Sequence, residues 1–334
     1  MENRYKHILV VRTDSIGDVM LTLPLCGELK KNFPDCRITF LGKSYTQDVI
    51  AACVHVNQFV NADTLAQLSE DEQVEQLRLL HCDAVVHVFP TRQWTKLCAK
   101  ARIPIRVATS GRWFTWFTCN RRIRFSRKRS NLHESQLNMI LLRGLGLSVA
   151  PSLQEIKTLY GFSPAAGLSF PIALQAEKTK VILHPLSKGS ALNWPLASFR
   201  ALMDALPAEH FQIIISGTEA EGQQVRGALG PLPVHVTDAT GTMNLRTFIA
   251  FIAQCNALVA ASTGPLHIAA AVGIHAIGLY APQRPIHPGR WQPVGKNAKV
   301  FVMPQAPKEG EMLTINPLEV AAYLMELHAA RLPK

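Results

Sequence analysis

The chain opens on the apolar run His7-Ile-Leu-Val-Val11, followed at once by Arg12-Thr-Asp-Ser-Ile-Gly-Asp18. A short, continuous apolar run of this kind predicts a strand of a parallel sheet that is buried on both faces. A helical pattern follows over residues 19–32 and ends at Pro34, and a second strand pattern covers residues 37–41. Strand, loop and helix in this order indicate the start of an α/β domain with a parallel sheet.

Strand and helix patterns continue to alternate, among them a helix over 69–80 that begins with a Ser-x-x-Glu capping box. The segment 151–178 is rich in Pro, Gly, Ser and Ala and lacks a long periodic run, which indicates a linker. The alternation then restarts, so we expect two α/β domains, 1–165 and 166–317, and a C-terminal helix over 318–331. The strands expected in the second domain cover 180–184, 211–216, 257–261 and 275–280.

Length and composition exclude several protein classes. The chain has 334 residues, of which 48% are hydrophobic, and a length of this kind suggests about two domains and excludes general disorder. The first apolar run is too short for a signal peptide, and the apolar stretch 257–281 is interrupted by Pro, Gly and His, so no membrane span is expected. Seven cysteines without a Cys-x-x-Cys pair argue against a disulfide framework and a cysteine zinc site. We therefore expect a soluble cytoplasmic protein.

The positive charge is concentrated in one segment. The net charge is +11, yet no Asp or Glu lies between Asp83 and Glu134, and 12 of the 35 basic residues lie there. The rest of the chain is close to neutral. A field of one sign attracts polyanions such as anionic lipid or a phosphorylated glycan. The densest part of the segment contains Arg121, Arg122, Arg124, Arg127, Lys128 and Arg129.

The same segment contains the aromatic run Arg112-Trp-Phe-Thr-Trp-Phe117. Its four aromatic residues have helical spacing. Two interpretations stay open, namely packing in the core or an amphipathic surface at a membrane interface. The sequence contains no helix-turn-helix or zinc-finger pattern, so nucleic acid is not an expected partner.

The loop after the first strand carries two carboxylates, Asp14 and Asp18. A carboxylate at the edge of a cleft can accept a proton from an attacking hydroxyl group, and either residue could instead cap the helix. The loop lacks the Gly-x-Gly-x-x-Gly pattern, so the dinucleotide fingerprint is absent.

Three loops in the second half of the chain are candidates for binding phosphate. Two of them follow predicted strands, and the third is fixed by prolines. The first, 184–195, holds Ser187 and Lys188 among small residues, which suits a diphosphate. In the second, Ser262-Thr-Gly264 lies at a strand end and helix start, with His267 one turn into the helix as a ligand or a structural residue. The third, 281–291, contains three prolines and the cationic side chains Arg284 and Arg290.

Three of these motifs together resemble the ADP-heptose:lipopolysaccharide heptosyltransferase family, glycosyltransferase family 9. The opening stretch 12–24 resembles the family's first motif, the loop 184–195 its first nucleotide loop, and 262–271 its second. The motifs occur in order over nearly the whole chain.

The resemblance implies a GT-B fold, in which two Rossmann-like domains with parallel sheets face a central cleft. Domain 1–165 would bind the acceptor, domain 166–317 the nucleotide-sugar donor, and the helix 318–331 would pack back on the first domain. It implies an inverting, metal-independent enzyme without a cofactor, which moves a heptose or related sugar from an ADP-sugar to a lipopolysaccharide inner-core acceptor. The enzyme would be cytoplasmic and peripheral on the inner face of the inner membrane.

The resemblance also assigns roles to single residues. Asp18 matches the catalytic base, and Glu221 roughly matches a ribose-binding acid for which Glu219 competes. The basic residues 121, 122, 124 and 127–129 would bind the acceptor or the membrane, and no residue is expected to bind a metal. The residues expected to bind the donor are Ser187, Lys188, Glu221, Met243, Ser262, Thr263, Gly264 and His267.

Two positions depart from the family pattern. Ser262 stands where the family carries Asp before Thr-Gly, and Leu192 and Asn193 stand where it carries a lysine before Trp-Pro. Two alternatives therefore stay open. One is a GT-B enzyme with another nucleotide-sugar donor, either a UDP-sugar transferase or an epimerase. The other is a non-catalytic relative that binds glycan or membrane.

Overall fold

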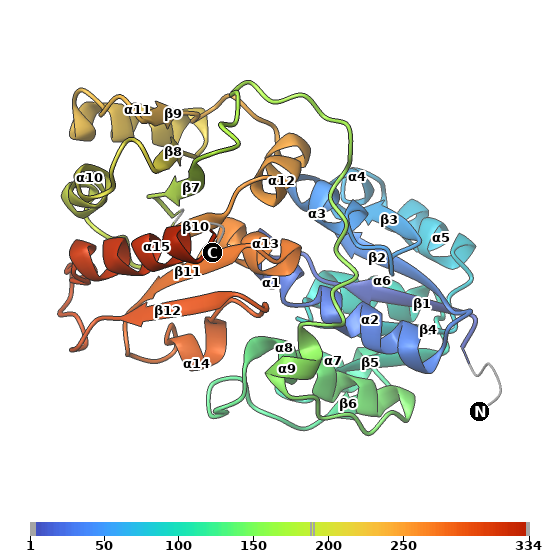
Figure 1. The fold of residues 1–334 in the computed structure, drawn as a ribbon. Coiled ribbons are helices and arrows are strands. Elements are labelled where there is room, and N and C mark those ends of the chain that lie inside the picture. Colours follow the sequence, from blue (N-terminus) through green and yellow to red (C-terminus); the bar gives the residue numbers. More distant parts are fainter. Residues whose placement is uncertain (1–4, 188, 190, 332–334) are drawn as a thin grey trace. The chain divides into compact units, whose positions relative to one another are not determined.

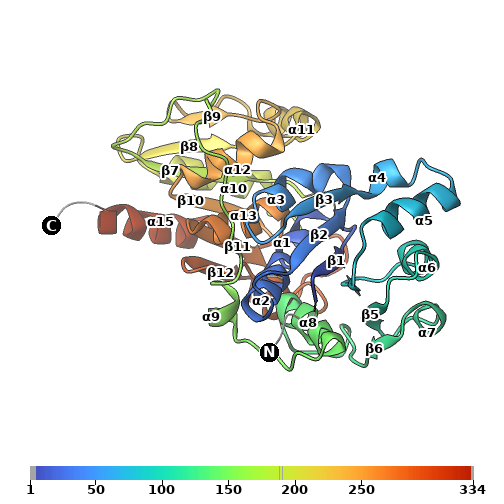
Figure 2. The ribbon, with the colours of Figure 1, turned by 90° about the vertical axis from the view of Figure 1, so that its right-hand side faces the viewer.

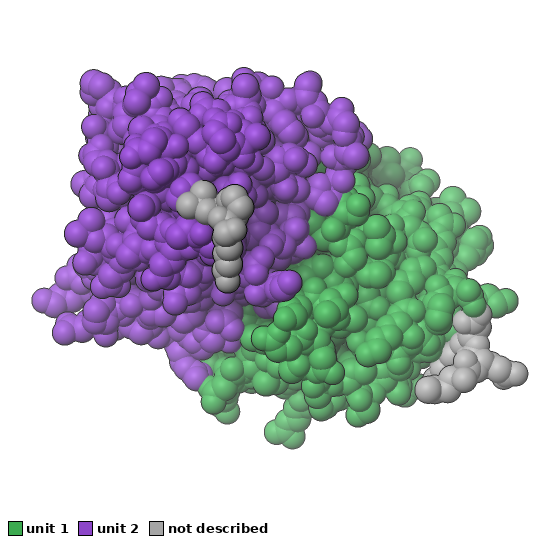
Figure 3. Space-filling view, in the orientation of Figure 1, with its two compact units in different colours: residues 1–163 green, residues 164–334 purple. Residues whose placement is uncertain are grey.

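The computed structural model describes residues 5–187, 189 and 191–331. The chain divides into two compact units, residues 1–163 and 164–334 (Figure 3). This division falls two residues before the boundary expected from the sequence. Each unit contains one parallel sheet with helices on its faces (Figure 1), as the alternating pattern predicts.

The sheet of unit 1 has six parallel strands in the order β3-β2-β1-β4-β5-β6. Strand β1 is central, and the chain reverses its direction of travel across the sheet between β1 and β4. The carboxyl ends of these two strands therefore form the topological switch point, where ligands of such sheets bind. The strands are β1 (His7–Val11), β2 (Arg37–Gly42), β3 (Gln58–Asn61), β4 (Ala84–His87), β5 (Ile105–Thr109) and β6 (Arg121–Ile123).

Helices cover both faces of this sheet (Figure 2). Helices α5 and α6 contact each other over a core cluster that includes Leu9, Val85 and Trp94, and α2 contacts α8. The helices are α1 (Ile16–Met20), α2 (Leu23–Asn32), α3 (Gln47–Ala51), α4 (Ala62–Leu65), α5 (Glu70–Leu79), α6 (Arg92–Lys100), α7 (Thr115–Thr118), α8 (Glu134–Ile140) and α9 (Leu153–Ile156), with 3-10 turns η1 (Ser44–Thr46) and η2 (Leu141–Leu145). The capping box of Ser69 and Glu72 before α5 is confirmed.

The first helical segment differs from its prediction. The sequence pattern predicts one helix over 19–32, whereas the structure has α1, a break at Leu21 and Thr22, and then α2. Pro24 explains the break because proline has no N–H to donate to the carbonyl group one turn earlier. The break makes α1 a short helix that serves mainly to hold the loop after β1.

The sheet of unit 2 repeats the topology of unit 1. Its order is β9-β8-β7-β10-β11-β12 and its paired strands are parallel, so β7 takes the place of β1 and β10 the place of β4. The switch point lies between β7 and β10. The strands are β7 (Thr179–His184), β8 (Phe211–Ile215), β9 (Val236–Asp238), β10 (Ala257–Ala261), β11 (His275–Tyr280) and β12 (Ala298–Val302).

The helices of unit 2 are α10 (Leu196–Ala205), α11 (Glu219–Leu229), α12 (Leu245–Ala253), α13 (Gly264–Val272), α14 (Pro288–Trp291) and α15 (Pro317–Arg331). Helix α15 packs against α10 within unit 2, and Val320 and Leu324 join the same core cluster as Phe199. His328 of α15 also hydrogen-bonds Thr179 of β7, at 2.9 Å. The expectation that the C-terminal helix also packs on the first domain stays a prediction.

The seven cysteines are all buried, and none of them forms a disulfide. Their thiols therefore contribute as small apolar side chains. Within the described ranges, no helix is both long enough and apolar enough to span a membrane.

Candidate functional site

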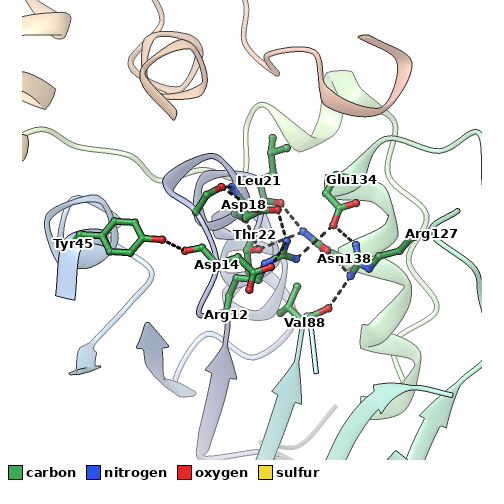
Figure 4. Close-up of polar contacts among 11 residues, drawn as sticks. Arg12, Asp14, Asp18, Leu21, Thr22, Tyr45, Val88, Arg127, Glu134 and Asn138 are labelled. Atoms are coloured by element: carbon green, nitrogen blue, oxygen red, sulfur yellow. Dashed lines mark hydrogen bonds and ion pairs between the residues drawn. The ribbon is translucent and has the colours of Figure 1, made fainter. Parts of the chain in front are cut away.

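A buried arginine organises the switch point of unit 1 (Figure 4). Arg12 directly follows β1, and its guanidinium group forms an ion pair with Asp18. Its Nη2 lies 3.3 Å from Asp14 and its Nη1 3.5 Å from Glu134. Burial by itself lowers the pKa of Arg12, but the three carboxylates outweigh that effect and raise it. The side chain is therefore a fixed cation at the strand end.

Asp18 is the third residue of α1 and points back to the loop before the helix. Ser15 Oγ donates a hydrogen bond to Asp18 Oδ2 at 2.7 Å and accepts one from the Asp18 N–H at 3.4 Å. Ser15 is therefore the N-cap, and the interpretation of Asp14 as the helix cap is wrong. The Asp18 side chain remains 19% exposed, so part of the carboxylate faces solvent while Arg12 and Ser15 fix its orientation.

Asp14 lies beside Asp18 in the same loop and is 24% exposed. Burial raises the pKa of Asp14 above its usual range, and neighbouring Arg12 does not fully offset this. Tyr45 Oη donates to the Asp14 carbonyl group at 2.7 Å, which holds the loop backbone in place. A partly exposed carboxylate with a raised pKa is a reasonable proton acceptor, so the geometry keeps Asp14 as a rival of Asp18.

A second layer of side chains supports Arg12 from α8. Glu134 is buried at the start of α8 and forms an ion pair with Arg127 as well as with Arg12. Arg127 Nη2 donates to the Val88 carbonyl group at 2.7 Å and to Asn138 Oδ1 at 3.0 Å. These contacts connect the ends of β1 and β4 to α8. They therefore hold Arg12 in place, and Arg12 in turn orients Asp14 and Asp18.

Sequence reasoning missed this second layer. Arg127 belongs to the basic residues expected to bind the acceptor or the membrane, but its side chain is only 13% exposed and forms an ion pair with Glu134. The available signal was Glu134, the first acid after a long acid-free segment. The other five members of that group are exposed: Arg121, Arg122, Arg124, Lys128 and Arg129.

A histidine ends one strand of each central pair, and His87 is buried whereas His184 is partly exposed. His87 is the last residue of β4, is fully buried, and has no hydrogen-bond partner for either ring nitrogen within the described chain. Burial lowers the pKa of His87 to about 3. His184 ends β7, and its Nδ1 lies 3.0 Å from Ser216 Oγ. Burial lowers the pKa of His184 to about 4, so both imidazoles are neutral at pH 7.

The loop after β7 is shaped by its own side chains. Ser187 Oγ lies 2.9 Å from both the Ala191 carbonyl oxygen and Asn193 Oδ1, and the Ser187 N–H donates to the same Asn193 oxygen at 3.1 Å. Asn193 therefore stabilises the turn at the position of the family's lysine. Lys188, expected to bind the donor, lies outside the described residues.

The turn from β10 to α13 brings the second expected donor motif to the same edge of the sheet. Thr263 precedes α13, and its buried Oγ1 has no partner among the residues described. Gly264 begins the helix, where free N–H groups favour an anion. Ser262 hydrogen-bonds the Tyr280 hydroxyl group, and His267 is buried one turn into α13.

The acidic residues expected near the ribose lie at the start of α11. Glu221 Oε2 accepts hydrogen bonds from the N–H and hydroxyl groups of Thr218 at 2.6 and 2.8 Å, which completes a capping box. Glu219 instead pairs with Arg226 at 2.6 Å. Met243 is half-buried directly before the N-cap Asn244 of α12.

The proline-rich loop 281–291 contains α14. The Arg290 guanidinium group lies 4.9 Å from the centre of the Trp291 ring, and Trp291 Nε1 donates to the Pro285 carbonyl group at 2.9 Å. Throughout the described part of the chain, no three His, Cys, Asp or Glu side chains are grouped so as to hold a metal.

Comparisons with known proteins identify the family of this chain. The profile of "Glycosyltransferase family 9 (heptosyltransferase)" matches residues 113–318. A putative glycosyltransferase of Haemophilus influenzae is 27% identical over 318 residues, which is 91% of each chain. Lipopolysaccharide heptosyltransferase 3 of Escherichia coli is 24% identical over 309 residues, 85% of each chain.

Solved structures show the same fold. The ADP-heptose lipopolysaccharide heptosyltransferase II of E. coli superposes with a TM-score of 0.76 at 19% identity, over 97% of this chain and 99% of that one. The E. coli heptosyltransferase WaaC with ADP gives a TM-score of 0.72 at 18% identity, over 96% of this chain and 99% of the other. The two α/β units thus have the architecture of GT-B transferases.

Proposed function

Because the chain belongs to glycosyltransferase family 9, the heptosyltransferases, we propose that it moves a heptose or a related sugar from an ADP-sugar to a lipopolysaccharide inner-core acceptor. The name of the E. coli relative supports the acceptor class. The ADP complex of a structural neighbour supports the donor class. The proposal places the enzyme on the cytoplasmic face of the inner membrane.

The observation that carries this proposal is the pair of carboxylates held by Arg12 at the switch point of unit 1. The reaction is a single displacement without a metal. Asp18 accepts the proton of an acceptor hydroxyl group while that oxygen attacks the anomeric carbon. The bond from this carbon to the diphosphate breaks, so the configuration inverts and ADP leaves with the bonding electron pair. Asp18 then returns its proton to solvent.

The switch point of unit 2 would hold the donor. Backbone N–H groups at the start of α13, the Thr263 hydroxyl group and the loop of Ser187 and Lys188 would bind the diphosphate. Glu221 and Met243 would contact the nucleoside, and Gly264 and His267 would complete the turn. The proposal needs no further cofactor.

Ser262 favours a second candidate donor. The family carries a carboxylate at this position, whereas Ser262 has a small side chain that is hydrogen-bonded to Tyr280. A site without that carboxylate has lost an acceptor for sugar hydroxyl groups. A different sugar on the nucleotide is therefore the alternative within the same family.

A thermal-shift panel with ADP, ADP-heptose, UDP, UDP-sugars and NAD tests the donor. A ligand at 100 times its Kd adds about 2.7 kcal/mol to the folded state, which raises Tm by a few degrees in a chain of this size. We expect stabilisation by ADP and ADP-heptose and turnover that EDTA leaves unchanged. Stabilisation by UDP compounds alone would overturn the donor assignment, and loss of turnover with EDTA would overturn the metal-free mechanism.

A further inference from the structure

Three large aromatic side chains are exposed on and beside α7. The exposed fractions are 65% for Trp113, 59% for Trp116 and 83% for Phe117. We call these residues the aromatic patch. The rings of Trp113 and Phe117 contact each other edge to face, with centroids 6.5 Å apart. The interpretation of this run as core packing is therefore wrong for these three residues. Clustered apolar surface of this kind marks an interaction site more often than single exposed residues do.

A basic cavity borders the aromatic patch. It has a volume of about 700 Å³ and follows β6, an edge strand of the unit 1 sheet. Its charged lining consists only of arginines, and none of them has an ion-pair partner among the described residues. We call this cavity the arginine hollow. Its side-chain lining includes Trp116, Arg121, Arg122, Arg124 and Arg143.

The patch and the hollow form one continuous surface. Trp116 belongs to both, and the Arg122 guanidinium group lies 4.8 Å from the centre of its ring. Arg122 Nη1 donates to the Cys119 carbonyl group at 2.7 Å, which fixes the side chain between the two regions. An occupant of this surface must therefore supply both negative charge and apolar volume.

We infer that the aromatic patch and the arginine hollow together dock the protein on a membrane that contains anionic phospholipid. The aromatic rings would enter the interface between headgroups and acyl chains, where Trp is favoured. The arginines would bind the headgroup phosphates, to which guanidinium groups can make paired hydrogen bonds. A bilayer offers phosphate and apolar volume side by side, which matches the surface. The inference rests on the proposed function in one respect, because the proposed acceptor is what would require the protein to bind a membrane.

Vesicle binding tests the charged half of the surface. The full-length protein should sediment with phosphatidylethanolamine vesicles that contain phosphatidylglycerol, and binding should weaken steeply with added salt. The variant R121Q/R124Q should bind about 30-fold more weakly, since each basic residue near such a surface contributes about fivefold. The matched control is K96Q/K100Q, because both lysines lie in the same acid-free segment but pair with Glu70. This control should bind like the wild type.

Substitutions in the aromatic patch distinguish a role in membrane docking from a role in catalysis. The variant W113A/F117A should lose roughly tenfold or more in vesicle binding. It should keep wild-type turnover on a soluble acceptor oligosaccharide that lacks lipid. The exposed residue Val234 of unit 2 supplies the control V234A. Brominated lipid should quench tryptophan fluorescence in the wild type, and less in W113A/W116A.

Several outcomes would overturn the inference. One is wild-type vesicle binding by folded W113A/F117A, and another is equal loss in the K96Q/K100Q or V234A control. A loss of turnover on the lipid-free acceptor in W113A/F117A would assign the surface to the acceptor glycan. Vesicle binding is measured without donor or acceptor, so a failure of the proposed transferase reaction does not change this readout.

Discussion

The two switch points of this protein share one topology and differ in chemistry. In unit 1, the ends of β1 and β4 surround a buried arginine with three carboxylates, Asp14, Asp18 and Glu134. In unit 2, the described residues at the ends of β7 and β10 include a neutral imidazole, hydroxyl groups and a helix N-terminus. The fold therefore fixes where chemistry takes place, and the residues directly after each strand decide which chemistry it is.

The chemical difference between the two switch points fits two separate roles in the proposed reaction. Carboxylates next to a diphosphate would repel it, whereas neutral hydroxyl and N–H groups at a helix start stabilise it. A fixed arginine holds a carboxylate in one orientation without neutralising all three acids. In the proposed reaction, one switch point would therefore accept a proton and the other would receive the anionic leaving group.

The largest expected effect comes from replacing Asp18, the proposed base. Asp18→Asn should lower kcat by roughly 10²- to 10⁴-fold, because the acceptor hydroxyl group then keeps its proton. The Tm shift caused by ADP should stay at the wild-type value, since the proposed donor residues lie in unit 2. Steady-state kinetics and thermal shift measure the two effects.

Asp14→Asn is the matched control for this experiment, because Asp14 contacts the same arginine. A larger loss of kcat in Asp14→Asn than in Asp18→Asn would transfer the role of base to Asp14. The acidic limb of the pH–rate profile would then lie above the usual pKa of aspartate, because burial raises the pKa of Asp14.

An effect of medium size is expected on the pH dependence of stability, and it distinguishes His87 from His184. The pKa of His87 is lowered to about 3 in the folded state, whereas the unfolded chain binds a proton below about pH 6.5. Stability is therefore lost as the pH falls below 6.5. Between pH 6.5 and pH 5 this loss is roughly 2 kcal/mol for one histidine. His87→Leu should remove it, as urea unfolding at both pH values would show.

His184→Leu sharpens the comparison. It should also weaken the pH dependence, because the pKa of His184 is lowered to about 4. At pH 7, however, it should destabilise the protein by about 1 kcal/mol because Ser216 loses a hydrogen-bond partner. His87→Leu removes no such bond and should be neutral or stabilising at pH 7. A destabilised His87→Leu at pH 7 would show that the imidazole has a partner.

The smallest effect on stability is expected at Glu221. Because Gln also serves as the third residue of a capping box, Glu221→Gln should change the free energy of unfolding by less than about 0.5 kcal/mol. If the carboxylate binds the ribose, the same variant weakens ADP binding, which calorimetry measures. The control is Glu219→Gln, whose carboxylate pairs with Arg226 instead. Unchanged ADP affinity in Glu221→Gln would limit Glu221 to its capping role.

Much of this architecture follows from local sequence patterns. The strands 7–11, 257–261 and 275–280 have the predicted bounds, because buried parallel strands are continuous apolar runs between turn residues. Strand β6 was missed because its sequence Arg-Arg-Ile carries no apolar pattern, and edge strands need none.

The candidate site was predicted less completely. Asp18 and Thr263 could be proposed from the sequence because each lies near the start of the helix that follows a predicted strand. The roles of Glu134 and Arg127 depend on contacts between residues far apart in the chain, and no local pattern reports such contacts. The exposure of Trp113 and Phe117 was likewise undecided, because helical spacing does not say which way a helix faces.

The division into two units has a consequence for biosynthesis. All six strands of the first sheet lie within residues 1–163, so we expect this unit to fold while the second is still being translated. At 5–20 residues per second, the ribosome needs on the order of 10–30 s to add the second unit. The aromatic patch and the arginine hollow belong to the first unit. The nascent chain would therefore present its docking surface before it could bind a nucleotide, and its arrival at the membrane could begin on the ribosome.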